Sequence, residues 1–375
     1  MRIMEDPTVL QTKLQVKAFM DWVTARCRGS VFAATGFGKT RISVMACVYA
    51  LKQSDLKVLY LTPTTVLKEN FEDTMKELGH EHLLQRVELQ CYASATKVKE
   101  NKYACIIGDE IHLGLTEKCL KLYTAERAER MLFLTATPPE NTMHRMMLQM
   151  RAPKVFAITL DQCVKHGFVA PYSLECVSVE LNVEEKAKYK VVNNNFGHWK
   201  YILETDEDVR TGKRVYKALP NAFREASNII ATKGNSKEDY QAATGFYRAI
   251  RQRKKIIDNA SAKVVMAATT IKALNKTALV FGGDNAFTNK LSEAIPGSLI
   301  YHSKITPKKR KEALAAFKAG TCKTLCSTKS LNQGVNVPES DLGLVCGLTS
   351  KALTMIQRLG RFIRRSKDPN KVGRV

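Results

Sequence analysis

The chain lacks the features that mark secreted, membrane-spanning and zinc-binding proteins. Its ten cysteines include no Cys-x-x-Cys pair, and the two nearest in sequence, Cys322 and Cys326, have no histidine partner. We therefore expect buried, reduced thiols rather than a zinc or iron–sulfur site. No apolar stretch is long enough to cross a membrane, and no secretory signal stands at the amino end. An intracellular location is expected, in the cytoplasm or in a bacterial or phage-infected host cell.

Acidic residues are scarce relative to basic ones. The 375 residues include 36 Asp and Glu against 59 Lys and Arg, a formal net charge of +23 with a pI of about 9.6. This imbalance predicts a polyanionic partner, nucleic acid. The basic residues gather in three places, at 248–255, at 304–311 and in the tail at 358–374. Such runs are usually solvated faces, and we favour phosphate contact for some of them only because motor motifs accompany them.

A glycine-rich stretch has the pattern of a phosphate-binding loop. The apolar run at 29–34 predicts a buried strand, and the spacing of apolar residues at 41–51 predicts a helix. A strand, a glycine turn and a helix place backbone N–H groups around phosphates. Because Ala33 replaces the usual first glycine, a helix-capping turn is the alternative. The residues expected to bind ATP here are Thr35, Gly36, Gly38, Lys39 and Thr40, with Lys39 on the β- and γ-phosphates and Thr40 on Mg²⁺.

A second apolar run, at 103–108, ends in the acidic pair Asp109 and Glu110. Carboxylates at the carboxyl end of a buried parallel strand lie at the ligand-binding edge of a doubly wound sheet. We expect Asp109 to hold Mg²⁺ through water and Glu110 to orient and deprotonate the attacking water. A solvated acidic pair that begins a helix is the alternative, which the neighbouring phosphate loop disfavours.

Two arginines near the carboxyl end complete the predicted active site. Arg361 and Arg364 lie one turn apart on a predicted helix, so their guanidinium groups face the same direction. An arginine that reaches the γ-phosphate contributes roughly 10³ to 10⁵ in rate, which explains why a second domain supplies one. A basic solvated helix is the alternative for this segment alone. The three stretches together predict two domains that close on one nucleotide.

These motifs resemble those of the superfamily-two helicases and translocases, over most of the chain. Residues 109–112, Asp-Glu-Ile-His, resemble the DExH box, and 135–137, Thr-Ala-Thr, resemble the motif that links ATP to nucleic acid. The resemblance implies that Gln15 reads adenine; an ordinary surface position is the alternative. It implies coupling roles for His112, Thr135, Thr137 and Gln357. It also implies nucleic-acid contacts by Thr62, Pro63 and Thr64.

The second half continues the resemblance. Residues 277–283 and 301–303 resemble the first two strands of the second motor domain, and 327–338 a motif that contacts nucleic acid and nucleotide. Gln333 and Asn336 stand where the family commonly has Glu and Asp, which puts any role that needs negative charge in doubt. The further residues implied are Gly282, His302 and Thr328 for nucleic acid and Asn336 for ATP.

The expected fold is α/β, with two RecA-like parallel-sheet domains in tandem and a largely helical insertion between them. The boundaries are 1–165, 166–275 and 276–375, and a hydrophobic content of 45% can build two cores. Residues 165–171 resemble the exit segment of the XPB/UvsW-like (phage-type) DNA helicase branch, and 173–181 alternate as a strand would. Because the family continues into one more strand after the arginine motif, we expect a second domain shortened at its end or a shortened chain.

The predicted function is an ATP- and Mg²⁺-dependent nucleic-acid helicase or translocase, a monomer that acts on DNA. One alternative is an RNA helicase, because phosphate contacts do not discriminate the sugar. Another is a nucleic-acid-binding or annealing protein in which ATP is a switch. The intact Glu110 argues against that second alternative, while Gln333 and Asn336 leave it open.

Overall fold

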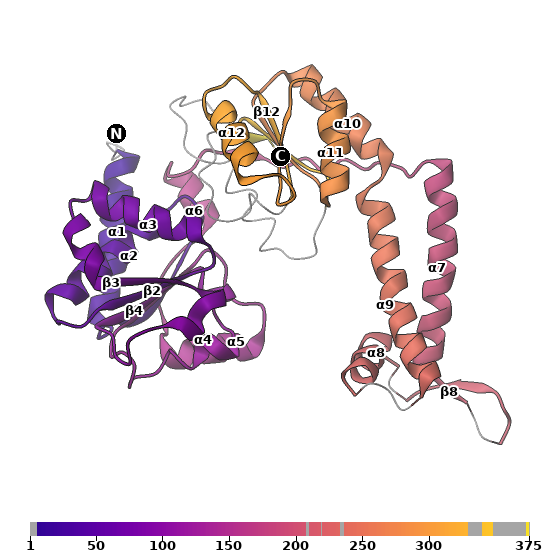
Figure 1. The fold of residues 1–375 in the computed structure, drawn as a ribbon, viewed down its shortest axis with the longest axis horizontal. Coiled ribbons are helices and arrows are strands. Elements are labelled where there is room, and N and C mark those ends of the chain that lie inside the picture. The colour runs from indigo at the N-terminus through magenta and orange to yellow at the C-terminus, as the bar shows by residue number, and fades with distance from the viewer. Residues whose placement is uncertain are drawn as a thin grey trace.

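In the part of the chain that the structure describes, two parallel six-stranded sheets and a long helical arm form the fold (Figure 1). The computed structural model describes residues 6–207, 210–218, 220–232, 236–328, 340–347 and 373–374. The arm leaves the second sheet and extends along the side of the first lobe. This arrangement confirms the expected α/β class with two parallel-sheet domains and helices between them. In the described residues, no helix combines the length and the apolar character needed to cross a bilayer.

The first sheet has the strand order β3-β2-β4-β5-β1-β6. Its central strands are buried along their whole length, as expected for parallel strands with helices on both faces. Successive side chains of β2 alternate between two core clusters, with Tyr60 in one and Leu59 and Leu61 in the other. The strands are β1 (Arg28–Ala33), β2 (Val58–Thr62), β3 (Val87–Cys91), β4 (Cys105–Asp109), β5 (Met131–Thr135) and β6 (Lys154–Ile158).

Helices cover both faces of this sheet. The first begins at Pro7, whose ring suits the first turn, and Asp6 caps it by accepting a hydrogen bond from the Thr8 N–H at 2.6 Å. The α-helices are α1 (Pro7–Thr24), α2 (Lys39–Lys52), α3 (Thr65–Glu77), α4 (Glu117–Leu120), α5 (Thr142–Arg151) and α6 (Leu160–Lys165). Three short 3-10 helices accompany them, η1 (Glu81–Arg86), η2 (Tyr92–Lys97) and η3 (Ile111–Leu113).

The second sheet has the order β11-β12-β10-β13-β14-β7. Its strands are β7 (Tyr172–Ser173), β10 (Ala278–Phe281), β11 (Leu299–Tyr301), β12 (Thr324–Ser327), β13 (Leu342–Val345) and β14 (Gly373–Arg374). The helices that accompany it are α10 (Ser261–Leu274), α11 (Asn285–Ala294) and α12 (Pro307–Lys318). Both β7 and α10 precede residue 276, so elements of the predicted connector contribute to this lobe.

The strand predicted at 173–181 is wrong beyond its first residue. Strand pairing stops at Ser173, opposite Arg374 at the edge of the second sheet, and the residues that follow have no regular structure. The alternating Val177 is 62% exposed, so the pattern does not mark a buried face. A strand needs a neighbour for its backbone hydrogen bonds, and alternation alone does not supply one.

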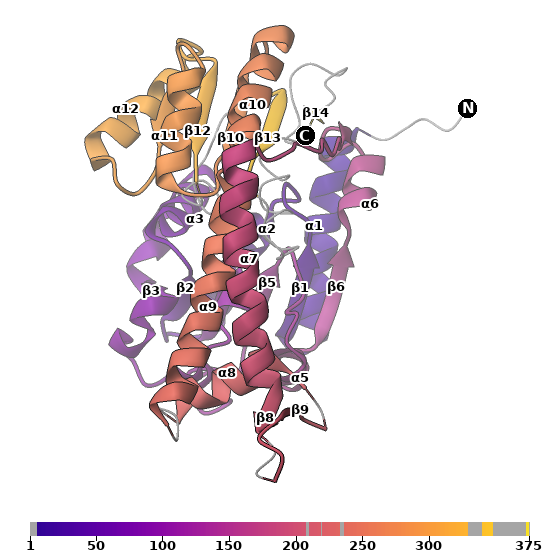
Figure 2. The same cartoon turned by 90° about the vertical axis from the view of Figure 1, so that its right-hand side faces the viewer.

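The arm is a pair of long helices, α7 (Val183–Glu204) and α9 (Lys237–Asp258), packed side by side (Figure 2). At its far end lie α8 (Ala222–Ala231) and a hairpin of β8 (Thr205–Glu207) and β9 (Arg214–Tyr216), which the sequence pattern did not predict. The arm has its own small core around Phe246. Gly245 lets the two helices approach, because a Cβ there would lie 2.6 Å from the Trp199 ring.

Candidate active site

The predicted phosphate loop follows β1 and leads into α2. Gly36 and Gly38 have φ angles of +88° and +87°, a region that favours glycine. Close packing also requires glycine at both positions. A Cβ on Gly36 would lie 2.5 Å from Val169 Cγ1, and one on Gly38 would lie 2.4 Å from Gln15 Nε2. The loop therefore presents bare backbone at the N-terminus of α2, where no side chain caps the helix. Unsatisfied N–H groups at a helix start form a site for anions such as phosphates.

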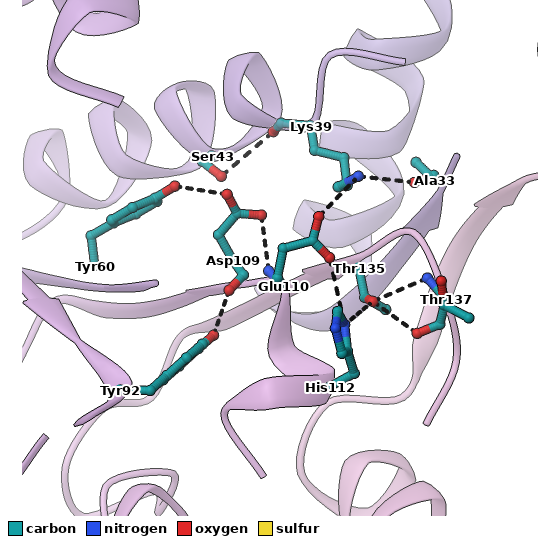
Figure 3. A network of polar contacts seen from close by, with 10 residues as sticks. All are labelled: Ala33, Lys39, Ser43, Tyr60, Tyr92, Asp109, Glu110, His112, Thr135 and Thr137. Carbon is teal, nitrogen blue, oxygen red and sulfur yellow. Dashed lines mark hydrogen bonds and ion pairs between the residues drawn. The ribbon is translucent and has the colours of Figure 1, made fainter. Parts of the chain in front are cut away.

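A continuous series of polar contacts leads from this loop across the sheet edge (Figure 3). Lys39 Nζ donates to the Ala33 carbonyl at 3.2 Å and lies 3.6 Å from Glu110 Oε1. The other oxygen, Glu110 Oε2, lies 3.5 Å from His112 Nδ1, and that nitrogen is 2.9 Å from Thr135 Oγ1. Thr135 in turn donates to the carbonyl of Thr137 at 2.8 Å. The structure thus connects five residues that the sequence predicted separately.

Asp109 is held more tightly than its neighbour. One carboxylate oxygen accepts a hydrogen bond from the Tyr60 hydroxyl at 3.1 Å and the other from the Glu110 N–H at 3.0 Å. The Tyr92 hydroxyl donates to the Asp109 carbonyl at 2.7 Å, so the backbone is fixed as well. Burial and the charge of Glu110 raise the pKa of Asp109 to about 6, although Lys39 opposes the shift. The site therefore holds a buried carboxylate whose charge is not fully balanced.

Glu110 stands in an unusual backbone conformation, with φ of +49° and ψ of 51° in the left-handed region. Its Oε2 is buried and has no hydrogen-bond partner among the described residues, although His112 is near. Burial lowers the pKa of His112, while Glu110 acts in the opposite direction. A neutral imidazole can accept or donate at Nδ1, so this group can relay a change between Glu110 and Thr135.

The residues present fit a magnesium–nucleotide complex. Thr35 Oγ1 is buried without a hydrogen-bond partner in the described chain, and it belongs to the predicted phosphate loop. Asp109 and Thr40 are the predicted oxygen donors. Within the described residues, no group of three His, Cys, Asp or Glu could hold a metal ion.

Gln15 is buried, and its Nε2 donates to the Phe37 carbonyl at 2.7 Å. The neighbouring Gln11, one turn earlier on α1, donates to the carbonyls of Gly36 and Phe37 at 3.0 and 3.1 Å. Both amides therefore hold the phosphate loop through hydrogen bonds to its backbone carbonyls. Recognition of adenine by Gln15 stays a prediction.

The residues predicted to contact nucleic acid lie where strands end. Thr62 ends β2 and is fully buried, and Thr64 caps α3 by accepting from the Leu67 N–H at 3.4 Å. Pro63 lies between them and is partly exposed. In the second sheet, Gly282, His302 and Thr328 directly follow β10, β11 and β12 and are all buried. These six residues thus come from carboxyl strand ends, and their contacts with nucleic acid stay predictions.

Five predicted residues lie outside the described part of the chain: Gln333, Asn336, Gln357, Arg361 and Arg364.

The sequence analysis did not predict the residues that support the site through hydrogen bonds to Asp109 and to the backbone of the phosphate loop. Tyr60 had a signal, since it is a tyrosine inside an otherwise aliphatic strand and a buried tyrosine hydroxyl usually needs a partner. Tyr92 and Gln11 had none. Phe37 is also buried. Its ring centroid lies 5.8 Å from that of Phe156 in β6 and 6.1 Å from that of Phe168, so the exit segment packs against the phosphate loop through Phe168.

Comparison with protein families agrees with this geometry. A model described as DEAD/DEAH box helicase matches residues 12–123, and one described as helicase conserved C-terminal domain matches residues 250–366. The chain belongs to the superfamily-two helicases. As a member of this family it is an ATP-hydrolysing enzyme. The assignment of Lys39, Asp109 and Glu110 to its nucleotide site stays a prediction.

Individual relatives are distant. The chain is 22% identical over 365 residues to the DNA 3′-5′ translocase XPB2 of Sulfurisphaera tokodaii, covering 94% of this chain and 78% of that protein. It is 21% identical to a Sulfolobus islandicus filamentous virus protein whose name assigns it to the helicases, covering 95% of this chain and 61% of the relative. The likeness to XPB2 and to a viral protein confirms the predicted branch of this superfamily.

A solved structure has the same fold. The helicase domain of Hef from Pyrococcus furiosus superposes with a TM-score of 0.57 at 16% identity, covering 97% of this chain and 94% of that one. The similarity supports the arrangement of two sheets with helices between them.

Proposed function

We propose that this helicase-family enzyme uses Mg²⁺ and ATP to move along DNA. The observation that carries the proposal is the unbroken contact series from Lys39 through Glu110 and His112 to Thr135 and Thr137. It gives the nucleotide site a physical connection to a loop at the sheet edge where the nucleic-acid motifs lie. DNA is supported by the name of the XPB2 translocase and by the net charge of +23.

The ion pair of Lys39 with Glu110 indicates the first step of the proposed ATP cycle, in which ATP binds and this pair separates. Lys39 must leave Glu110 Oε1, 3.6 Å away, to reach the β- and γ-phosphates of ATP. Glu110 is then free to orient a water molecule and accept its proton. Asp109 and Thr40 would hold Mg²⁺, and the cation would supply positive charge to neutralise the charge that develops on the transferred phosphoryl group.

The loss of the Lys39–Glu110 ion pair can also affect the residues proposed to couple ATP to nucleic acid. When Glu110 changes partner, His112 loses a neighbouring carboxylate, and its hydrogen bond with Thr135 Oγ1 changes strength or direction. Thr135 also accepts from the Thr137 N–H at 3.1 Å, so the loop after β5 responds. Arg361 and Arg364 are proposed to reach the γ-phosphate when the two domains close. Alternating grip by residues 62–64 and by the Thr328 region would then advance the strand.

An ATPase assay with different nucleic acids tests the proposal. We expect duplex or branched DNA to raise the turnover of a monomeric enzyme more than RNA of matched length, because the site is proposed to act on DNA. Stronger stimulation by RNA would favour the RNA-helicase alternative. Tight binding of nucleic acid with no stimulated hydrolysis would favour the binding or annealing protein.

A further inference from the structure

Helix α9 carries a run of five cations, and the structure divides it into two groups. Arg253 turns into the arm, with its guanidinium carbon 4.2 Å from the centroid of the Phe196 ring and its Nη2 3.0 Å from the Tyr189 hydroxyl oxygen. Lys254 Nζ lies 2.9 Å from Asp258 Oδ2 on the same helix. These two cations therefore serve the arm itself.

The other three cations, Arg248, Arg251 and Lys255, share one face of α9. They are spaced by three and four residues, which places them in a row along the helix, and all three are exposed. Among the described residues none of them forms an ion pair, although the charge of Lys255 acts on Asp284 from a longer distance. We call these three residues the basic row.

The basic row is not neutralised by its own helix. No acidic residue occurs in α9 from Gln241 to Ile257. Three of the four exposed lysines of the partner helix α7 differ, because each of the three has a carboxylate nearby, while Lys190 forms no ion pair among the described residues. Lys186, Lys188 and Lys200 lie 2.6, 3.9 and 3.8 Å from Glu180, Glu184 and Glu204. Unbalanced positive charge thus gathers on one of the two long helices of the arm.

The face that carries this row points away from α7. The buried side of α9 includes Phe246 and Ala249, and a residue two positions further along is turned by about 200°. Arg248 and Arg251 stand two positions after these buried residues, so they lie on the opposite side. In Figure 1, α9 is the arm helix nearer the first lobe and α7 the outer one, and Figure 2 agrees, with α7 in front. The basic row therefore faces the first lobe.

We propose that the basic row binds the phosphate backbone of duplex DNA and holds it along the inner side of the arm. The proposal rests on the DNA-translocating function proposed above and assigns it a surface outside the two sheets. Charge complementarity identifies nucleic acid as the ligand, since arginines and lysines in a row without ion pairs attract a polyanion. Single strands are usually bound by exposed aromatic side chains on which bases stack. The one exposed aromatic side chain of α9 in the described residues is Tyr240, eight residues before Arg248, so none lies within the basic row, which favours duplex.

The test compares two triple variants that remove the same charge from the same arm. The first is Arg248→Gln, Arg251→Gln and Lys255→Gln on α9, and the matched control is Lys186→Gln, Lys188→Gln and Lys200→Gln on α7. Binding of a short DNA duplex is measured at several salt concentrations. Three lost phosphate contacts should reduce the magnitude of the log–log salt slope by about 2.7 in the first variant. The control should keep the slope of the wild-type protein, and ATP hydrolysis without DNA should be unchanged in both.

Every outcome of this test either supports the inference or overturns it. Equal slopes for the first variant and the wild-type protein would overturn this inference alone, as would an equal fall in both variants. A loss confined to single-stranded DNA would overturn the choice of duplex. If the wild-type protein itself failed to bind DNA, the proposed function would fail together with the inference.

Discussion

Lys39 and Glu110 lie 3.6 Å apart in the candidate active site, and we propose different chemical roles for them. We expect Lys39→Ala to abolish hydrolysis, because the γ-phosphate loses its positioned cation. Glu110→Gln should keep ATP bound but lose the base, so that the nucleic-acid-bound state accumulates. ATP affinity and single-turnover hydrolysis, measured for both variants, separate the two roles. An equal loss of ATP affinity in both variants would mean that Glu110 is structural.

The buried carboxylate of Asp109 makes a prediction about stability. Its pKa rises from 3.8 to about 6 in the folded protein, chiefly through burial. A raised pKa in an acid means that the folded state binds more protons, so in metal-free protein stability should fall as pH rises from about 4 to 6. Asp109→Asn should remove this dependence and stabilise the protein near pH 7, by less than about 3 kcal/mol.

Asparagine limits that gain because its amide nitrogen cannot accept a hydrogen bond, so one of the bonds from Tyr60 and Glu110 is lost. Urea unfolding of both proteins at pH 4.5 and pH 7, with EDTA present, measures the difference. A variant less stable than wild type at pH 7 would show that the charge of Asp109 does not destabilise the folded protein.

At the scale of elements, the phosphate loop depends on the segment that leaves the first domain. Gly36 packs against Val169, and a Cβ there would come within 2.5 Å of Val169 Cγ1. Gly36→Ala should therefore weaken ATP binding at least about tenfold, since backbone strain and the clash both displace the loop. Gly79→Ala is the matched control, because Gly79 also has a positive φ, of +75°, but nothing lies within 4 Å of its Cβ.

Nucleotide titration and thermal unfolding distinguish the two glycine variants. Both should lose stability of about 1–2 kcal/mol from the left-handed backbone, and only the variant at Gly36 should lose ATP affinity. Retention of normal ATP affinity by Gly36→Ala would show that the loop shifts without consequence and that Val169 does not support it.

The elements that the sequence predicted well are those whose pattern arises locally. The apolar run before Gly36 became β1, and the run before Asp109 became β4, because strands buried on both faces need continuous apolar residues. The strand expected at 173–181 failed because pairing depends on a partner distant in sequence. The hydrogen bond of Tyr60 with Asp109 could not be predicted either, since it joins neighbouring strands whose register the sequence does not specify.

For the whole molecule, the charge and the arm suggest how DNA can be held without reading its sequence. Contacts to phosphates carry no sequence information, and a motor that advances stepwise must hold each successive position equally. The arm is anchored to the second lobe, because Glu185 at the start of α7 accepts a hydrogen bond from the Ser261 N–H at 2.8 Å at the start of α10. A movement of the second sheet relative to the first would therefore carry the arm with it.

The two-domain mechanism depends on the arginines, and Arg364→Ala tests it. Arg361 and Arg364 lie outside the described residues, so the expectation comes from their one-turn spacing and their place in the matched C-terminal helicase domain. A cation that acts on charge developing in the transition state should matter little for ground-state binding. We expect ATP affinity to stay within a few-fold of wild type while DNA-stimulated hydrolysis falls by roughly 10³.

Lys318→Ala, at the end of α12, provides a control that removes one exposed cation from the same lobe. Equilibrium binding of a fluorescent ATP analogue and steady-state hydrolysis with saturating DNA give the two readouts for each variant. A segment of residues 1–165 should correspondingly hydrolyse almost no ATP, because it lacks both arginines. Hydrolysis by that segment at the stimulated rate of the whole chain, or an Arg364→Ala variant as active as Lys318→Ala, would contradict closure of two domains on one nucleotide.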